Sequence, residues 1–430
     1  MEELQEIQKQ LEREHKHTPS AGTLQKLTTI RTEINTLSTQ AIKRKFVYSF
    51  GYPAKCFAAS SQPLNAADVT TGNIITHPSK IQDAFESFYK NLYAGVPRGA
   101  EYEMDDFLNS LCLPSLNEEQ NKMMIAEVTE AELMNAINRL KYNKSPGSDG
   151  YTAEWYWEFK QDLIPTLLTN FNCVLKTAQM PPSWKEAIIS AIPKEGKDKM
   201  ECGSYRPISV LNIDYRLFIS IMAKRMEEIL PDLISNDQTG FIRRRQTQDN
   251  IRRTLHVIHQ IQTSKSTAML MSIDAEKAFD SVNWDFLYKV LDKFGLHKEI
   301  VDTVRALYTN PTARIKVNGS LSNSFVLQRG NRQGCAWSPL LFALYLEPLA
   351  QSIRQNKDIK GITIAGQEHK LKHIKTQNTY KTQQKCSRML GAVLNFCYLV
   401  STQAIKYQRP DLVCGNRQMN FFLLLLFDYI

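Results

Sequence analysis

The sequence predicts an α+β fold, and three observations carry this prediction. Apolar residues recur at the spacing of an amphipathic helix through long segments such as 212–230. Short apolar runs such as Met269–Ile273 are typical of buried strands. The segment 313–327 contains Asn318-Gly319, a dipeptide that favours the two-residue turn of a β-hairpin.

Residues 1–80 are expected to form a helical pair followed by a linker. Apolar residues at helical spacing run through two segments, which the turn-like sequence T-P-S-A-G at 18–22 separates. Glycine and proline then recur through residues 46–80, as they do in linkers. We therefore expect this N-terminal region to be helical and to precede the main domain.

The next region, residues 81–141, is predicted to be a helical approach to that domain. Ile81, Phe85, Phe88 and Leu92 share one helical face. Such an apolar face more often packs into a protein core than stacks against bases, so we interpret it as core.

Two local patterns in the same region concern a helix start and a pair of carboxylates. Thr129 and Glu132 have the spacing of a capping box. Asp105-Asp106 is the only Asp-Asp pair of the chain and invites a catalytic interpretation. Its surroundings, E-M-D-D-F-L, are instead typical of a solvated helix face, which is the interpretation we favour.

The charge balance favours an anionic partner. The chain has 53 Lys and Arg against 44 Asp and Glu, a formal net charge of +9. Nucleic acid fits better than a membrane, because no stretch reaches the roughly 18 apolar residues that a spanning helix needs. The opening M-E-E-L-Q-E lacks an apolar signal region, so we expect a cytoplasmic or nuclear protein that is neither secreted nor transmembrane.

The eight cysteines form no C-x-x-C pair, which argues against a zinc ribbon and a disulfide scaffold. Cys386, Cys397 and Cys414 have spacings that fit no zinc module. Free thiols are therefore expected.

Five stretches of the chain carry the functional signal. They are 144–156 (K-S-P-G-S-D-G-Y-T-A-E-W-Y), 184–194 (W-K-E-A-I-I-S-A-I-P-K), 205–212 (Y-R-P-I-S-V-L-N), 272–280 (S-I-D-A-E-K-A-F-D) and 330–341 (G-N-R-Q-G-C-A-W-S-P-L-L). In order and spacing they resemble the reverse transcriptase of LINE-type non-LTR retrotransposons. The resemblance implies an RNA-directed DNA polymerase whose partners are an RNA template, a DNA primer and deoxynucleoside triphosphates. It also implies an α+β fold with right-hand polymerase fingers and a partial palm at residues 142–371, in which helices back an antiparallel sheet.

The stretch M-L-M-S-I-D is an apolar strand that ends on the carboxylate of Asp274. Such a carboxylate suits Mg²⁺, because this hard cation takes a few oxygen ligands on a rigid support and keeps other positions for phosphate and water. The alternative is that Asp274 merely ends the strand. By the resemblance, Asp274 and the backbone carbonyl of Ala275 bind two Mg²⁺ ions, and Phe279 packs under the sugar and excludes a ribose 2′-hydroxyl.

Two strands and a loop supply the expected nucleotide-binding residues. The proline after Arg206 forces this arginine into an extended conformation, from which its guanidinium can bind two phosphate oxygens. The resemblance assigns Lys194 and Arg206 to the fingers strands that grip the triphosphate, with a surface ion pair as the alternative. It assigns Gln333 and Gly334, in R-G-N-R-Q-G, to the nucleotide and template pocket. Ser338 is expected to be the N-cap of the helix that follows.

The densest basic segment is expected to contact nucleic-acid phosphates beside the template channel, without reading sequence. Basic runs are more usually solvated faces, and that alternative stays open. The residues concerned are Arg243, Arg244, Arg245, Arg252 and Arg253.

The motif set breaks after the segment 361–371 (G-I-T-I-A-G-Q-E-H-K-L), which we interpret as the first half of a hairpin. The family then requires a turn with an aromatic residue, any residue and Asp-Asp, but no Asp or Glu occurs between Lys372 and Pro410. Asp274 is left as the only assigned metal carboxylate. We therefore expect a two-metal site that is incomplete, an inactive polymerase fragment, and an unrelated tail at 372–430 that could be disordered.

Two other interpretations remain. The chain could be a non-catalytic RNA- or DNA-binding remnant that keeps the cationic residues but not the chemistry. The chain could also be a group II intron-type maturase, which has a similar palm, but the five stretches resemble the LINE pattern more closely. The sequence leaves the oligomeric state open.

Overall fold

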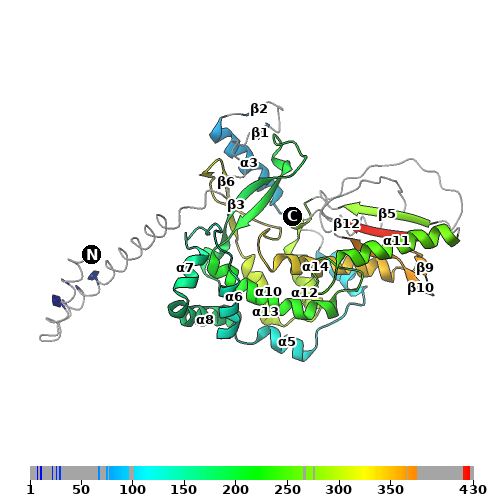
Figure 1. Ribbon diagram of the computed structural model, residues 1–430, viewed down its shortest axis with the longest axis horizontal. Coiled ribbons are helices and arrows are strands. Elements are labelled where there is room, and N and C mark those ends of the chain that lie inside the picture. Colours follow the sequence, from blue (N-terminus) through cyan, green and yellow to red (C-terminus); the bar gives the residue numbers. More distant parts are fainter. Residues whose placement is uncertain are drawn as a thin grey trace. The chain divides into compact units, whose positions relative to one another are not determined.

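The computed structural model (Figure 1) describes residues 77–95, 101–264, 268–274, 277–364, 366–374 and 420–426, together with two short strands and isolated N-terminal positions. The chain divides into two units, Met1–Gln62 with Asn143–Ser145, and Pro63–Tyr142 with Pro146–Ile430. In the first unit, isolated positions between Ile7 and Ile30 are helical. The rest of the predicted helical pair lies outside the described residues.

The second unit contains a five-stranded mixed sheet in the order β4-β3-β6-β7, with β8 also paired to β6. β3 runs antiparallel to β4 and parallel to β6, and β6 runs antiparallel to β7 and β8. The strands are β3 (Glu186–Pro193), β4 (Tyr205–Val210), β6 (Thr312–Val317), β7 (Ser320–Leu321) and β8 (Phe325–Val326). The fold is therefore mixed α and β, but the prediction of a purely antiparallel sheet is wrong for this part of the chain.

The turn between β6 and β7 has the conformation that its sequence predicts. Asn318 and Gly319 both have positive φ angles, 48° and 84°, as the favoured two-residue turn requires. Val317 pairs with Ser320 directly across this turn. The predicted hairpin is confirmed.

Helix α3 (Pro78–Leu92) packs against the five-stranded sheet (Figure 1). Its buried residues Ile81 and Phe85 share one apolar cluster with Ile189 and Ile315 of the sheet, and Phe88 packs against that cluster. The interpretation of this helical face as core is confirmed.

A larger helical core surrounds α10 (Ile213–Leu233), in which 13 of the 21 residues are buried. A helix that buries this large a share of its residues packs against neighbours on several sides. The helices that contribute to this core are α4 (Glu101–Asn109), α5 (Glu118–Ile125), α6 (Glu130–Asn138), α7 (Ala153–Glu158), α8 (Lys160–Thr177), α9 (Pro182–Lys185), α12 (Trp284–Lys293), α13 (Lys298–Leu307) and α14 (Ser338–Gln355). Among the described residues, no helix combines the length and the apolar composition needed to cross a membrane.

Three local predictions in this core have clear outcomes. Thr129 and Glu132 form both hydrogen bonds of the capping box at the start of α6. Asp105 is exposed on α4 and forms an ion pair with Lys289 at 2.5 Å, so the surface-helix interpretation of the Asp-Asp pair is confirmed. The prediction for Ser338 is wrong, because α14 begins at this residue and Trp337 occupies the N-cap position without a side-chain hydrogen bond.

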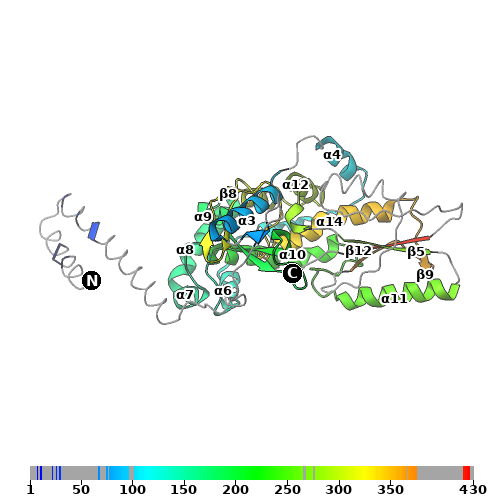
Figure 2. The same ribbon diagram turned by 90° about the horizontal axis from the view of Figure 1, so that it is seen from above.

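A second sheet contains the strand that ends on Asp274 and lies beside α11 in Figure 2. Its order is β11-β12-β5 and both pairings are parallel, so the antiparallel prediction is wrong here as well. The strands are β5 (Ala268–Asp274), β11 (Leu371–Ile374) and β12 (Asn420–Leu426), and the helix is α11 (Thr247–Ser264).

The central strand of this sheet, β12, comes from the segment 372–430, which was predicted to be an unrelated tail. Its sequence N-F-F-L-L-L-L is a nearly continuous apolar run, which suits a parallel strand with a neighbour on each side. The rest of the tail beyond residue 374, including Cys386, Cys397 and Cys414, lies outside the described residues apart from this strand. The segment 361–371 is already a complete short hairpin of β9 (Ile362–Ile364) and β10 (Gln367–His369).

The loop 146–150 is held against the start of α10. A Cβ atom at Gly147 would lie 2.0 Å from Oδ1 of Asn212 and 2.5 Å from its backbone nitrogen. The hydroxyl of Ser148 donates a hydrogen bond to the same Oδ1 at 3.3 Å. Only glycine therefore fits at this position.

Gly147→Ala should lower the free energy of unfolding by about 2 kcal/mol, because the added methyl group overlaps backbone and must displace it. At Gly203 a Cβ atom would meet its nearest neighbour at 3.7 Å, an ordinary contact. Gly203→Ala is thus the matched control and should change the stability by no more than about 0.5 kcal/mol. Urea unfolding of both variants checks this, and equal effects would contradict the close approach.

Candidate functional site

Asp274 is the last residue of β5, and its backbone pairs with Leu426 of β12. Its side chain and the whole of Ala275 lie outside the described residues. The two other strands of the sheet, L-K-H-I and N-F-F-L-L-L-L, carry no Asp or Glu. Among the described residues, no three His, Cys, Asp or Glu side chains come together as a metal site. The strands beside Asp274 therefore do not supply the donor set that two Mg²⁺ ions require.

A buried carboxylate lies a few residues further on, at Asp280 in the short helix η3 (Phe279–Ser281). Asp280 is only 2% exposed. Its Oδ1 accepts a hydrogen bond from the hydroxyl of Tyr93 at 2.7 Å, and both of its oxygens lie 3.1 Å from Nε2 of Gln333. Burial raises the pKa of Asp280 to about 6, against the opposing effects of these hydrogen bonds and of the charges of Lys277 and Lys194.

The loop that carries Gln333 joins η3 to the five-stranded sheet by backbone hydrogen bonds. The amide of Asn331 donates to the carbonyl of Phe279 at 2.7 Å, and the amide of Ser209 donates to the carbonyl of Gln333 at 2.7 Å. Gly334 has a φ of 103°, and a Cβ atom there would lie 2.7 Å from the carbonyl oxygen of Ser209. The loop is thus fixed between β4 and η3, and Gly334 is required by its conformation and its contact.

Phe279 precedes Asp280 in the chain, and its ring belongs to the helical core. The ring is 5% exposed and stacks on Phe342 of α14, with 4.3 Å between the ring centroids. This packing fixes the start of η3. The exclusion of a 2′-hydroxyl by Phe279 stays a prediction.

Lys194 and Arg206 lie at the same end of the β3–β4 pair. Arg206 pairs with Ile192 across the two strands, and the amide of Lys194 donates to the carbonyl of Ser204 at 2.9 Å. Both side chains are partly exposed. The charge of Lys194 acts on Asp280, so the structure gathers Lys194, Phe279 and Gln333 around this carboxylate.

Three residues of this cluster were not predicted from the sequence: Asp280, Lys277 and Tyr93. A signal for Asp280 existed, since it follows Phe279 directly in the A-F-D-S segment. The ammonium of Lys277 lies 4.3 Å from the ring centre of Phe88. Nothing in the sequence links Tyr93 to Asp280, because 187 positions separate them.

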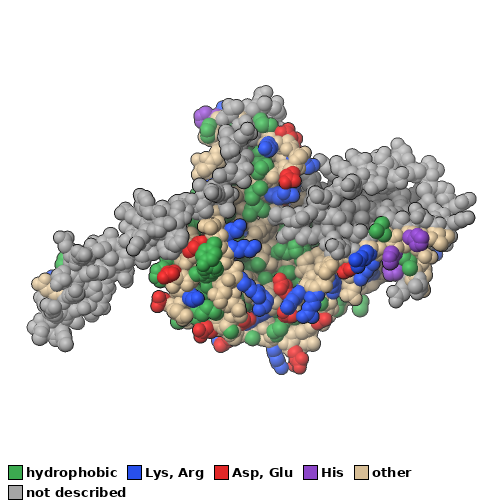
Figure 3. Space-filling model, in the orientation of Figure 1, with side chains coloured by type: hydrophobic (Ala, Val, Ile, Leu, Met, Phe, Trp, Pro, Cys, Tyr) green, Lys and Arg blue, Asp and Glu red, His purple; other side chains and the backbone are tan. Residues whose placement is uncertain are grey.

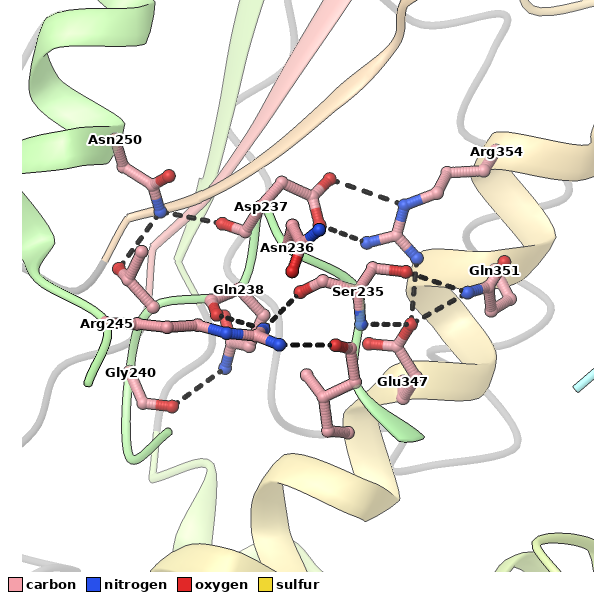
Figure 4. A network of polar contacts seen from close by, with 12 residues as sticks. Ser235, Asn236, Asp237, Gln238, Gly240, Arg245, Asn250, Glu347, Gln351 and Arg354 are labelled. Atoms are coloured by element: carbon pink, nitrogen blue, oxygen red, sulfur yellow. Dashed lines mark hydrogen bonds and ion pairs between the residues drawn. The ribbon is translucent and has the colours of Figure 1, made fainter. Parts of the chain in front are cut away.

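The predicted basic patch is divided between structural and exposed arginines. Arg245 donates hydrogen bonds to carbonyl oxygens in the last turn of α10 and just after it, as Figure 4 shows in part. The acceptors are Pro231 (3.0 Å), Ile234 (2.9 Å), Ser235 (2.6 Å) and Gln238 (2.9 Å). A cation at this position satisfies the open carbonyl groups of a helix C-terminus. Arg245 is therefore a structural cap.

The other four arginines also differ from one another. Arg243 forms an ion pair with Glu228, and Arg253 donates to the carbonyl of Asn236 at 3.0 Å. Arg244 and Arg252 are exposed. Lys and Arg side chains gather across the middle of the face in Figure 3, between the positions of α10 and α11 in Figure 1.

A buried ion-pair network anchors the segment that presents these arginines (Figure 4). Arg354 of α14 bridges Asp237 at 2.5 Å and Glu347 at 3.0 Å, and Glu347 is 0% exposed. Burial raises the pKa of Glu347, and the charge of Arg354 opposes this rise. The network ties the loop after α10 to α14.

Comparisons with known proteins identify a family that part of this chain resembles. Residues 192–380 match the model of the family described as reverse transcriptase (RNA-dependent DNA polymerase). Three of the five stretches lie entirely within this match, those at 205–212, 272–280 and 330–341.

Three curated relatives illustrate the similarity. The "Transposon TX1 uncharacterized 149 kDa protein" of Xenopus laevis is 28% identical over 293 residues, which is 68% of this chain and 22% of the relative. The "Probable RNA-directed DNA polymerase from transposon BS" of Drosophila melanogaster is 28% identical over 238 residues, 54% of this chain and 26% of the relative. The "RNA-directed DNA polymerase from mobile element jockey" of the same species is 27% identical over 234 residues, 53% of this chain and 25% of the relative. The chain thus spans about a quarter of the length of these relatives.

Arg245→Ala should lower the free energy of unfolding by about 2 kcal/mol, because it leaves buried carbonyl groups without a donor. Arg252→Ala removes the same charge from an exposed position and is the matched control, with a change within about 0.5 kcal/mol. If the exposed arginines bind phosphates, Arg252→Ala should also reduce the salt dependence of RNA binding. Unfolding curves and salt titrations of both variants check the division, and a stable Arg245→Ala protein would contradict the capping role.

The buried carboxylate of Asp280 should make stability depend on pH. Its folded pKa of about 6 exceeds the ordinary 3.8, so the folded state binds the proton more tightly. The contribution of Asp280 to the free energy of unfolding is therefore greatest at low pH and falls by about 3 kcal/mol as the pH rises through the interval between these two values. The difference in stability between the wild type and Asp280→Asn, followed over pH, measures this fall. A constant difference would contradict the raised pKa.

Proposed function

We propose that this chain, which carries the reverse transcriptase domain of a LINE-type (non-LTR) retrotransposon, is a fingers and partial-palm fragment that binds primer–template and nucleotide without catalysing DNA synthesis. Reverse transcriptases in general use divalent metal ions and bind a nucleic-acid template and deoxynucleoside triphosphates. The identity of the metal as Mg²⁺, the RNA template and the DNA primer are parts of our proposal, as is a cytoplasmic or nuclear location.

The observation that carries the proposal of inactivity is the composition of the sheet around Asp274. Two metal ions that stabilise the entering and leaving oxygens of phosphoryl transfer need several carboxylate ligands. The strand beside β5 pairs Leu426 with Asp274, and neither β12 nor β11 carries an acidic residue. One carboxylate with one backbone carbonyl, from Ala275, leaves most of the charge of two divalent cations without a counter-charge.

The proposed nucleotide-binding role rests on the residues that lie around Asp280. Lys194 and Arg206 would attract the triphosphate, since both are partly exposed cations at one end of β3 and β4. Gln333 and Gly334 would face the nucleotide from the loop that is fixed to β4 and η3. Phe279 would form the wall against a 2′-hydroxyl from its packed position on Phe342.

Template binding would rest on the exposed part of the basic segment. Arg244 and Arg252 are exposed and would contact phosphates. Arg243 and Arg253 lie in the same segment, where Arg243 also pairs with Glu228 and Arg253 donates to the carbonyl of Asn236. These contacts carry no base specificity, so binding should weaken with salt irrespective of sequence. The same residues would suffice for the second candidate function, a non-catalytic RNA- or DNA-binding remnant, and the net charge of +9 supports either.

Primer extension on an RNA template with Mg²⁺ tests the proposed inactivity. We expect no product from the folded chain and salt-dependent binding of primer–template in the same preparation. Asp274→Asn is the control variant and should bind primer–template as tightly as the wild type or more tightly, because it removes negative charge. DNA synthesis that is abolished by Asp274→Asn would refute the inactivity, and failure to bind primer–template would refute the proposed function.

A further inference from the structure

We propose that Asp280 is a positioning residue that sets the orientation of the Gln333 carboxamide, with Nε2 held inward and Oε1 left as a hydrogen-bond acceptor for the bound nucleotide. The inference rests on the proposed nucleotide-binding function and adds to it a residue whose action passes through Gln333. Its first part, the orientation of the amide, is a property of the free protein.

The geometry allows only one orientation of the amide. Both oxygens of Asp280 lie 3.1 Å from Nε2 of Gln333. An ionised carboxylate can only accept hydrogen bonds, so rotating the amide would place Oε1 against two acceptors. The charge of the carboxylate thus fixes which end of the amide faces inward.

Asp280 is itself held in place from a distant part of the chain. The hydroxyl of Tyr93, which follows α3, donates to Oδ1 at 2.7 Å, and the carboxylate is almost completely buried. Lys277, Lys194 and Arg329 contribute positive charge around it, and the buried hydroxyl of Tyr89 is the other titratable group that it affects. The cations favour the ionised form on which the orientation depends.

The Oε1 end of the amide is an acceptor without a partner among the described residues. Oε1 of Gln333 is buried and, among the described residues, makes no hydrogen bond. Buried acceptors are normally satisfied, and a bound molecule can supply the missing donor. A nucleotide offers two kinds of donor, sugar hydroxyls and base N–H groups, and either would complete this site. The loop is fixed on both sides by backbone hydrogen bonds, so the acceptor does not have to be ordered when the nucleotide arrives.

The test is a double-mutant cycle on nucleotide binding, which requires no catalysis. A complex of the full chain with an RNA template and a dideoxy-terminated primer is titrated with the complementary deoxynucleoside triphosphate at about pH 8, where Asp280 is ionised. Gln333→Ala and Asp280→Asn should each weaken binding about tenfold, the usual effect of losing a hydrogen bond to a charged or buried group. The double variant should be no weaker than Gln333→Ala alone, because Asp280 acts through that side chain.

Asp292→Asn provides the matched control. It makes the same substitution on α12, where the carboxylate lies 3.7 Å from Arg305, and it should leave the nucleotide affinity within about twofold. Losses that add in the double variant would overturn the proposal, since they would mean that Asp280 acts independently of Gln333.

A second measurement separates this inference from the proposed function. The side-chain NH₂ signal of Gln333 is identified in ¹⁵N spectra of the free protein by its absence from Gln333→Ala. Asp280→Asn should shift this signal and Asp292→Asn should not. If Asp280→Asn leaves the signal unshifted, the positioning role is overturned even if the wild type binds nucleotide. If the signal shifts but the wild type does not bind nucleotide, the proposed function and the nucleotide-facing part of this inference are overturned.

Discussion

The buried carboxylate of Asp280 is the constraint on which the arrangement of the candidate site depends. An isolated carboxylate in a protein interior is strongly unfavourable, so it must be surrounded by donors and cations. Those partners come from three separate parts of the chain, Tyr93 after α3, Lys277 before η3, and Gln333 before α14. Satisfying one charge therefore brings these segments together, and the backbone bonds of the Gln333 loop extend the connection to β4.

The same principle operates at the far end of α10. Arg245 closes the open carbonyl groups after this helix, and Arg354 compensates the buried carboxylate of Glu347 on α14. Both cations are partners of the protein's own backbone or side chains. A basic segment that suggests a nucleic-acid surface thus consists in part of residues that hold its own loop in place, and only the exposed arginines remain available for phosphates.

Local signals in the sequence predicted local structure well. The turn at Asn318-Gly319 and the capping box at Thr129 depend only on residues that are neighbours in the sequence. The failures concern partners that are distant in the sequence. Parallel pairing of β12 with β5 depends on a segment more than a hundred residues away, and the hydrogen bond from Tyr93 to Asp280 has no local trace. Lys194, Phe279 and Gln333 were selected from motifs as candidate site residues. Asp280 was not selected, because its hydrogen bonds to Tyr93 and Gln333 join segments that are far apart in the sequence.

The central strand of the second sheet, β12, has an almost entirely apolar sequence. Its N-F-F-L-L-L-L sequence has no acidic residue, yet it pairs with β5 over all seven positions and with β11 on its other side. Main-chain hydrogen bonds form whatever the side chain, so the pairing of these strands does not depend on whether they carry acidic residues. The sheet at this edge of the domain can therefore keep its backbone pairing while the acidic residues of its strands vary.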